Sequence, residues 1–334
     1  MKQAGLLKIA LKRGALLAAA NWPVVLIQFT AESIFKVLVA VPVLSGVFMV
    51  TLLLGRDLRE LLNGDLRDIV TTVASALVSQ PAALAAFVFA FGLVLVGGSA
   101  LMFLVKGGTV WVLADADRSV GPIERSPLRL TALQAASRYS IDNFMSGAAR
   151  VSRRYLTLGL LLIIVYLLSA AGYLVAVFGG YRWITNRTLL VAWTLVAAFL
   201  STLLVAWITL VNLLYLLTQI VITVSGRGVR WSLREVLRFL RAELWDVMAV
   251  FGVVLVLVVL ATAASIGATA GLGLVAFIPV ATLVLLPLQL VAWLLRNLVF
   301  QYLGLTALTA YLHLYAPPAN EARERWPRSV SASH

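Results

Sequence analysis

The 334-residue sequence contains no cysteine and only two histidines. The absence of cysteine excludes disulfides, thiolate nucleophiles and metal centres bound by cysteine. The two histidines, His313 and His334, leave little material for histidine-ligated metals or for a Ser-His-Asp triad. We therefore expect neither a metal nor any other cofactor.

Charged residues are also scarce, at 12% of the chain, whereas 62% of the residues are hydrophobic and the mean hydropathy is +0.99. A soluble domain has roughly twice this share of charged residues. The composition predicts an all-α, polytopic bundle of transmembrane helices, because a helix satisfies its own backbone hydrogen bonds in lipid. Lys and Arg residues outnumber Asp and Glu residues by 27 to 14, so the polar surfaces of the protein are expected to favour anionic lipid headgroups.

Long apolar runs mark the membrane spans, since a helix needs about 20 residues to cross the hydrocarbon core. A membrane domain is expected over residues 23–316, followed by a polar, basic tail at 317–334. Residues 271–286 are expected to be broken or partly inserted, because Pro279 and Pro287 interrupt them. Six runs are predicted to span the membrane, at about residues 33–54, 82–105, 156–178, 189–222, 247–270 and 287–314.

The apolar stretch from Gly271 to Tyr315 also allows a second interpretation. It would cross the membrane twice, with Arg296 at the turn, and give seven spans. The positive-inside rule favours six spans, because they place 20 of the 27 Lys and Arg residues on the inner side and 5 on the outer side. Both termini are then expected in the cytoplasm.

Residues 1–22 form a basic segment ahead of the first predicted span. Its cations precede a short apolar stretch from Gly14 to Ala20, which superficially resembles a signal peptide. We expect instead an uncleaved amphipathic helix, with its leucines in lipid and its cations near headgroups. These cations are Lys2, Lys8, Lys12 and Arg13.

Two further amphipathic helices are predicted on the cytoplasmic side, each after a glycine-containing end of an even-numbered span. Ser126-Pro127, which follows Gly107-Gly108, is typical of a helix start. Ser232 and Glu235, which follow Gly226, fit a capping box. Arginines recur on one face of the second helix and form a candidate interface for lipid or for a protein partner: Arg234, Arg238 and Arg241.

This pattern, together with the closing run from Leu305 to Tyr315, resembles a broad bacterial superfamily of six-helix membrane proteins of unknown function. The superfamily includes the membrane region that accompanies glycerophosphodiester phosphodiesterases. The resemblance spans about residues 25–316 and implies six spans in a bacterial inner membrane. It carries no catalytic motif, so it implies no activity.

Polar residues inside predicted spans are candidates for function, because they are costly in lipid. Glu32 and Lys36 stand four residues apart, which predicts an ion pair on one helix face. Arg296, beside Asn297 and near Gln301, is a candidate contact for an anionic substrate or a lipid phosphate. Snorkelling of Arg296 to the headgroups is the simpler interpretation.

Other residues are interpreted as structural. Gly267 and Gly271 are a candidate interface, because small residues let helix backbones approach closely. Asn212 is expected to hydrogen-bond to a neighbouring helix. Asp115 and Asp117 lack the further ligands that a metal site requires, so they are expected to form a solvated loop face.

No acidic residue lies deep in any predicted span, so we do not expect an enzyme. The favoured function is a non-catalytic scaffold or accessory subunit of a membrane complex, because surface helices and small-residue faces offer contacts to membrane-protein partners. The alternative is a permease or lipid-handling protein for an anionic small molecule or lipid. Nucleic-acid binding is not expected, because the positive-inside rule already explains the cations.

Overall fold

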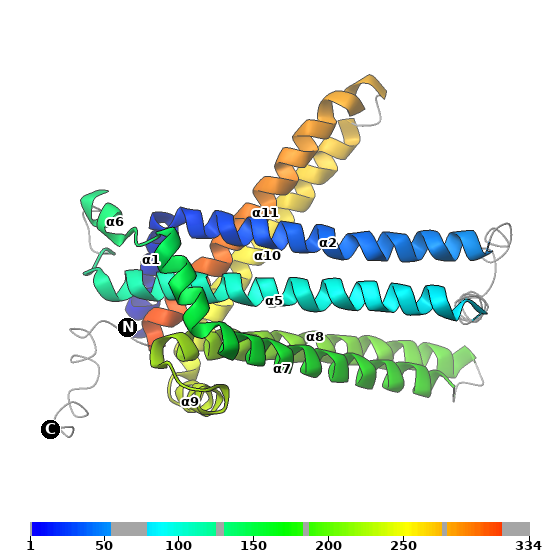
Figure 1. Ribbon diagram of the computed structural model, residues 1–334, viewed down its shortest axis with the longest axis horizontal. Helices are drawn as coiled ribbons and strands as arrows, with labels where there is room; N and C mark the ends of the chain where they lie inside the picture. The colour runs from blue at the N-terminus through cyan, green and yellow to red at the C-terminus, as the bar shows by residue number, and fades with distance from the viewer. Residues whose placement is uncertain (1, 55–78, 125–129, 183–186, 276–278, 316–334) are drawn as a thin grey trace. The chain divides into compact units, whose positions relative to one another are not determined.

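The computed structural model describes residues 2–54, 79–124, 130–182, 187–275 and 279–315, and within them all regular structure is α-helical (Figure 1). The predicted all-α class is therefore confirmed for these residues. Their helices are α1 (Lys2–Ala20), α2 (Trp22–Leu54), α5 (Pro81–Ser119), α6 (Leu130–Ala136), α7 (Ile141–Tyr181), α8 (Arg187–Ser225), α9 (Val229–Ala242), α10 (Leu244–Val275) and α11 (Pro279–Tyr315).

Six of the described helices are long and apolar enough to cross a membrane, namely α2, α5, α7, α8, α10 and α11. Large apolar side chains stay exposed along these helices. Phe89, Leu168 and Phe199 expose 73%, 68% and 68% of their surfaces. Exposed apolar faces of this extent fit contact with lipid rather than with water. The chain is thus a multi-pass membrane protein, as the composition predicts.

Two helices, α10 and α11, account for the region from Gly271 to Tyr315, for which the sequence allowed six or seven spans in total. α10 continues to Val275, α11 begins at Pro279, and the two helices pack against each other. Proline is tolerated in the first turn of a helix, where its missing N–H would have no helical partner, and α11 also contains Pro287. Arg296 lies in the middle of α11, so there is no turn at this residue and the seven-span interpretation is wrong.

The chain forms two compact units, one of Met1–Phe29 with Leu104–His334 and the other of Thr30–Phe103. In the second unit, the remainder of α2 packs on the first part of α5 through glycines. The ring of Phe87 lies against Gly46, and the ring of Phe35 lies against Gly98. Each glycine lets an aromatic ring approach the neighbouring helix backbone.

The core of the first unit brings α1, α7, α8, α9, α10 and α11 together with the adjoining ends of α2 and α5. α1 packs along α11, while α7 and α8 lie side by side (Figure 1). α9 contacts α7, α8 and α10. The most enclosed apolar members of this core include Val24, Val110, Leu113, Leu217, Ile220, Val236, Leu305 and Leu312.

α9 is amphipathic, as its arginine pattern predicts, but the predicted capping box is wrong. The helix buries Val236 and exposes Arg234, and it begins at Val229 with Gly228 as its N-cap. α8 ends where Gly226 adopts a φ of 64°, and the extended backbone of Gly228 then starts α9 before Ser232 is reached. Ser232 is therefore buried inside the helix rather than capping it.

The other predicted surface helix corresponds to α6, which the structure describes from Leu130 to Ala136. Its predicted start at Ser126-Pro127 lies outside the described residues, as does the predicted tail at 317–334. Gly107 and Gly108 do not end a span, because α5 runs on to Ser119.

Candidate functional site

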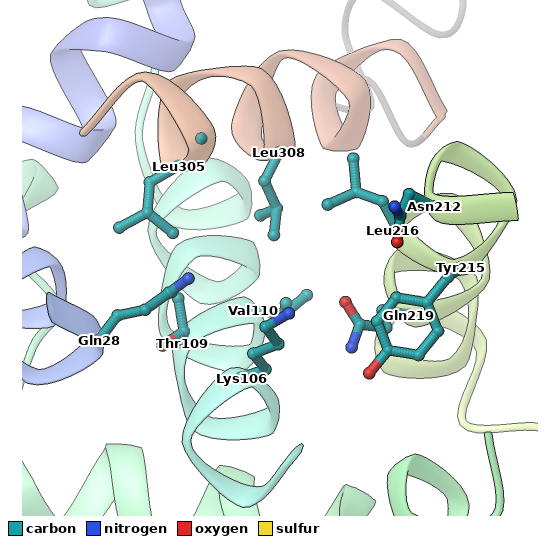
Figure 2. Close-up of a pocket in the computed structure, with 11 residues that line it drawn as sticks. Gln28, Lys106, Thr109, Val110, Asn212, Tyr215, Leu216, Gln219, Leu305 and Leu308 are labelled. Carbon is teal, nitrogen blue, oxygen red and sulfur yellow. The ribbon is translucent and has the colours of Figure 1, made fainter. Parts of the chain in front are cut away.

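A polar cavity of about 240 Å³ lies within the first unit, between residues of four candidate spans (Figure 2). Figure 2 shows Leu305 and Leu308 reaching from α11 toward the cavity, with Tyr215 and Gln219 on the side formed by α8. The lining consists of Gln28 from α2, Lys106, Thr109 and Val110 from α5, Asn212, Tyr215, Leu216 and Gln219 from α8, and Gly304, Leu305 and Leu308 from α11.

Helical spacing places these polar side chains on shared faces. Asn212, Tyr215 and Gln219 follow one another at intervals of three and four residues, so they form one stripe along α8. Lys106 and Thr109 stand three apart and share a face of α5 in the same way. The rest of each helix is mainly apolar, and the polar stripes therefore meet inside the protein.

Lys106 gives the cavity a positive charge. Its Nζ lies 5.6 Å from the centroid of the Tyr215 ring, within the range of a cation–π interaction. The lining residues of this cavity include no acidic side chain. An ammonium group in a low-dielectric setting attracts anions more strongly than the same group in water.

Two polar atoms at the cavity have no hydrogen-bond partner in the part of the chain that the structure describes. They are Gln28 Oε1 and Thr109 Oγ1. Thr109 and Gln219 each expose only 1% of their surface. Buried polar groups in folded proteins are almost always paired with protein, water or ligand. These atoms thus offer both donors and acceptors to a molecule in the cavity.

Hydrogen bonds from α7 position the polar stripe of α8. The hydroxyl of Tyr166 donates to Asn212 Oδ1, which confirms the predicted bond from Asn212 to a neighbouring helix. The hydroxyl of Tyr155 donates to the carbonyl oxygen of Gln219 at 3.0 Å and lies 2.8 Å from Thr223 Oγ1. Two points of attachment thus limit the rotation of α8 about its own axis.

Glycines hold the α5 part of the site against α7. A Cβ atom at Gly108 would lie 2.7 Å from the ring of Phe144, and one at Gly107 would lie 2.7 Å from the side chain of Val151. Both glycines therefore stay inside the helix, because their packing offsets the ~1 kcal/mol helix penalty of glycine. Lys106 directly precedes these two glycines on α5.

A second polar cluster lies where α1 meets the end of α5. Arg13 is fully buried, and its Nε donates to Asp117 Oδ1 at 2.6 Å while its Nη1 donates to Glu124 Oε2 at 3.1 Å. The same guanidinium donates to the carbonyl oxygens of Asp117, Val120 and Gly121 at 2.9, 3.0 and 3.0 Å. The predicted position of Arg13 near headgroups is therefore wrong, because two acidic side chains compensate its charge inside the protein.

The pKa of Arg13 reflects this environment. Burial alone would lower the pKa, but the charges of Asp117 and Glu124 and their hydrogen bonds outweigh that effect and raise it above its ordinary value. The folded state therefore favours protonated Arg13, and this contribution to stability is lost only as the pH rises through the raised pKa. Near neutral pH, Arg13 stays charged.

Asp115 and Asp117, which the sequence analysis assigned to one solvated face, have different environments. Asp115 is exposed and accepts a hydrogen bond from Asn143 Nδ2 at 3.3 Å. Asp117 is buried against Arg13 and lies 3.7 Å from Nδ1 of His313. The prediction of a solvated face is thus wrong for Asp117, because helix α5 continues past both residues and directs one of them inward.

The predicted anion contact on α11 lies apart from the cavity lining. Arg296 is exposed, with its guanidinium 5.7 Å from the centroid of the Phe300 ring. Asn297 Nδ2 donates to the carbonyl oxygen of Trp293 within the same helix at 2.9 Å. Neither these residues nor Gln301 lines the cavity.

The remaining predicted site residues have local surroundings. Lys36 Nζ lies 2.7 Å from Glu32 Oε1, which confirms the predicted ion pair in the second unit. A Cβ atom at Gly267 or Gly271 would meet no atom of the described chain within 4 Å, so the structure shows no close helix contact at these two glycines within the described residues. Arg234, Arg238 and Arg241 are exposed on α9, and Arg238 pairs with Glu235 at 2.7 Å.

The sequence reasoning missed Lys106 and Gln28 as site residues. Lys106 ends an apolar run and was counted as the first residue of a loop, while Gln28 precedes the predicted start of the first span. Both residues lie inside helices only because α2 begins earlier and α5 ends later than the predicted spans, and the sequence did not indicate these bounds. The chain matches no family model, no curated protein and no solved structure.

Proposed function

We propose that this protein binds an anionic small molecule or an anionic lipid headgroup in the cavity around Lys106, as a permease or lipid-handling membrane protein. The observation that carries the proposal is one lysine grouped with buried, unsatisfied polar atoms between four candidate spans. Ligand sites in helical membrane proteins typically lie between helices, and intramembrane charges commonly mark them.

The chemistry of the lining narrows the ligand class. Lys106 attracts an anionic group, the hydroxyl of Thr109 can donate a hydrogen bond, and Gln28 Oε1 accepts one. The ligand therefore carries an anionic group together with an O–H or N–H donor. The volume of about 240 Å³ limits the enclosed part to a small polar group. A phosphorylated polyol, free or as a lipid headgroup, has these properties.

The proposed role is non-catalytic. The residues that line the cavity supply neither a carboxylate nor an imidazole, which are the usual groups for proton transfer near neutral pH. Binding and release are the functions that this lining supports.

The test uses the full chain in mild detergent, with Lys106→Met and the matched variant Arg296→Met, which removes an exposed cation from another span. Glycerol 3-phosphate and phosphatidylglycerol serve as probes that separate a free solute from a lipid headgroup. We expect Lys106→Met to weaken binding of the preferred probe about tenfold, equivalent to ~1.4 kcal/mol, and Arg296→Met to leave it unchanged. Equal loss in both variants, or no binding of either probe to the native chain, contradicts the proposal.

A scaffold or accessory subunit is the second candidate, and the exposed arginine face of α9 is the observation that favours it. The same purification distinguishes the two functions. A companion protein at fixed stoichiometry that dissociates when Arg234 and Arg241 are changed to Glu supports the scaffold. A monodisperse chain without companions supports the carrier.

We further propose that the protein resides in a bacterial inner membrane with both termini in the cytoplasm. The support is the asymmetry of the cations around the spans predicted from the sequence, since 19 of the 27 Lys and Arg residues fall on the inner side even when Lys106 is counted as lying within the membrane. The accessibility of single cysteines measures this orientation.

A further inference from the structure

A second concavity lies between α1 and the two helices α10 and α11. It has a volume of about 630 Å³, more than twice that of the cavity around Lys106. Its walls are almost entirely apolar, with Leu7 and Leu11 from α1, Leu257 from α10 and Leu303 from α11. Both α10 and α11 are candidate spans, so the groove opens beside helices that lie in lipid.

Two lysines lie at the edge of this groove. Lys8 and Lys12 stand one helical turn apart on α1, and both line the groove. Lys12 Nζ donates to the carbonyl oxygen of Glu124 at 2.6 Å, whereas Lys8 is exposed and has no ion pair within the described residues. The groove therefore combines an apolar interior with an available cation.

The groove is held in shape by contacts of its own walls. The hydroxyl of Tyr302 donates to the carbonyl oxygen of Ala15 at 3.0 Å, which joins α11 to α1 across the base of the groove. Arg13, on the same helix, is anchored by its buried ion pairs. These contacts fix α1 against α11 and against the end of α5.

We infer that this groove binds one anionic phospholipid, with an acyl chain along Leu257 and Leu303 and its phosphate at Lys8. An apolar channel that ends at a cation is complementary to an amphiphile with an anionic head. A zwitterionic lipid gains less from Lys8, because its own cation opposes the attraction. This site is separate from the cavity around Lys106, and its lining shares no residue with that cavity.

The test reconstitutes the full chain in nanodiscs of phosphatidylcholine that contain a phosphatidylglycerol with a diazirine in its acyl chain. We expect photolabelling at Leu257 and Leu303, and competition by unlabelled phosphatidylglycerol but not by additional phosphatidylcholine. Lys8→Gln is expected to lower this labelling about fivefold, the equivalent of ~1 kcal/mol for one cation near an anionic headgroup. The matched variant Arg234→Gln removes an exposed charge from α9 and should leave the labelling unchanged.

A second variant tests the apolar part of the site. Leu257→Trp fills the groove at a partly exposed position without changing charge, and it is expected to abolish the labelling at Leu303. Equal labelling by a diazirine phosphatidylcholine, equal effects of Lys8→Gln and Arg234→Gln, or crosslinks between two copies of the chain in place of lipid would overturn the inference. Lys106→Met leaves this labelling unchanged, so failure here is distinguishable from failure of the proposed function.

Discussion

Through its five described hydrogen bonds, Arg13 joins α1 to the end of α5 and to the segment that follows α5. Replacing it with methionine preserves most of the side-chain volume but leaves Asp117 and Glu124 buried without a cation. We expect the free energy of unfolding to fall by about 3–5 kcal/mol, because an uncompensated buried charge is costly. Unfolding in mixed micelles with increasing SDS, followed by circular dichroism, measures the change.

The exposed Arg234→Met variant is the control for this measurement. It removes the same charge from the surface of α9, where the expected change is within about 0.5 kcal/mol. Comparable losses in the two variants would show that the network of Arg13 does not stabilise the fold.

For individual residues, the sequence predicts pairs within one helix but not partners from distant segments of the chain. The Glu32–Lys36 pair was predictable because both residues lie on one helix with a fixed spacing. The partner of Arg13 is 104 residues away, and nothing in the local pattern indicates it. Arg296 was selected as an intramembrane cation, whereas Lys106, which faces the polar stripe of α8, was not distinguished from a loop residue.

Among the helices, α1 depends on close contact with α11. A Cβ atom at Gly14 would lie 2.5 Å from the carbonyl oxygen of Thr306 and 3.1 Å from the backbone nitrogen of Ala310. Because both atoms belong to backbone, they cannot move aside as a flexible side chain does. The two helices must separate to accept any larger residue.

We therefore expect Gly14→Ala to destabilise the protein by about 1–3 kcal/mol through overpacking. Gly5 is the matched control on the same helix, since a Cβ there meets nothing within 4 Å. Gly5→Ala should be neutral or stabilise the helix by up to ~1 kcal/mol. Thermal unfolding of the two variants in detergent checks the difference, and equal midpoints would contradict the packing argument.

Helix existence was predictable from apolar runs, but helix ends were not. Gly107, Gly108 and Ser232 all carry signals that normally mark a helix boundary, yet all three lie inside helices. Tertiary packing decides these cases, as when Phe144 occupies the space beside Gly108. Gly226, with its positive φ, is the position where the boundary signal was correct.

For the molecule as a whole, six spans follow from length and hydropathy, and the structure agrees within the described residues. The cavity around Lys106 was not predictable, because four segments far apart in the sequence form it. The resemblance to a six-helix bacterial superfamily and the orientation of the termini stay predictions.

The absence of cysteine makes the orientation directly measurable, because each introduced thiol is unique. Gln80→Cys and Arg227→Cys place a thiol at exposed positions that precede α5 and α9. With both termini in the cytoplasm, an impermeant maleimide should label Gln80→Cys in intact cells and Arg227→Cys only after permeabilisation. The reverse pattern would invert the proposed topology.

The contact of α1 with α11 also sets the order in which the chain can assemble. Asp117 is translated about a hundred residues after Arg13, and Thr306 nearly two hundred residues after Asp117. The buried ion pair of Arg13 and the close contact of Gly14 therefore cannot form until those later residues have been synthesised. Helix α1 thus reaches its native contact with α11 only after α11 has been made.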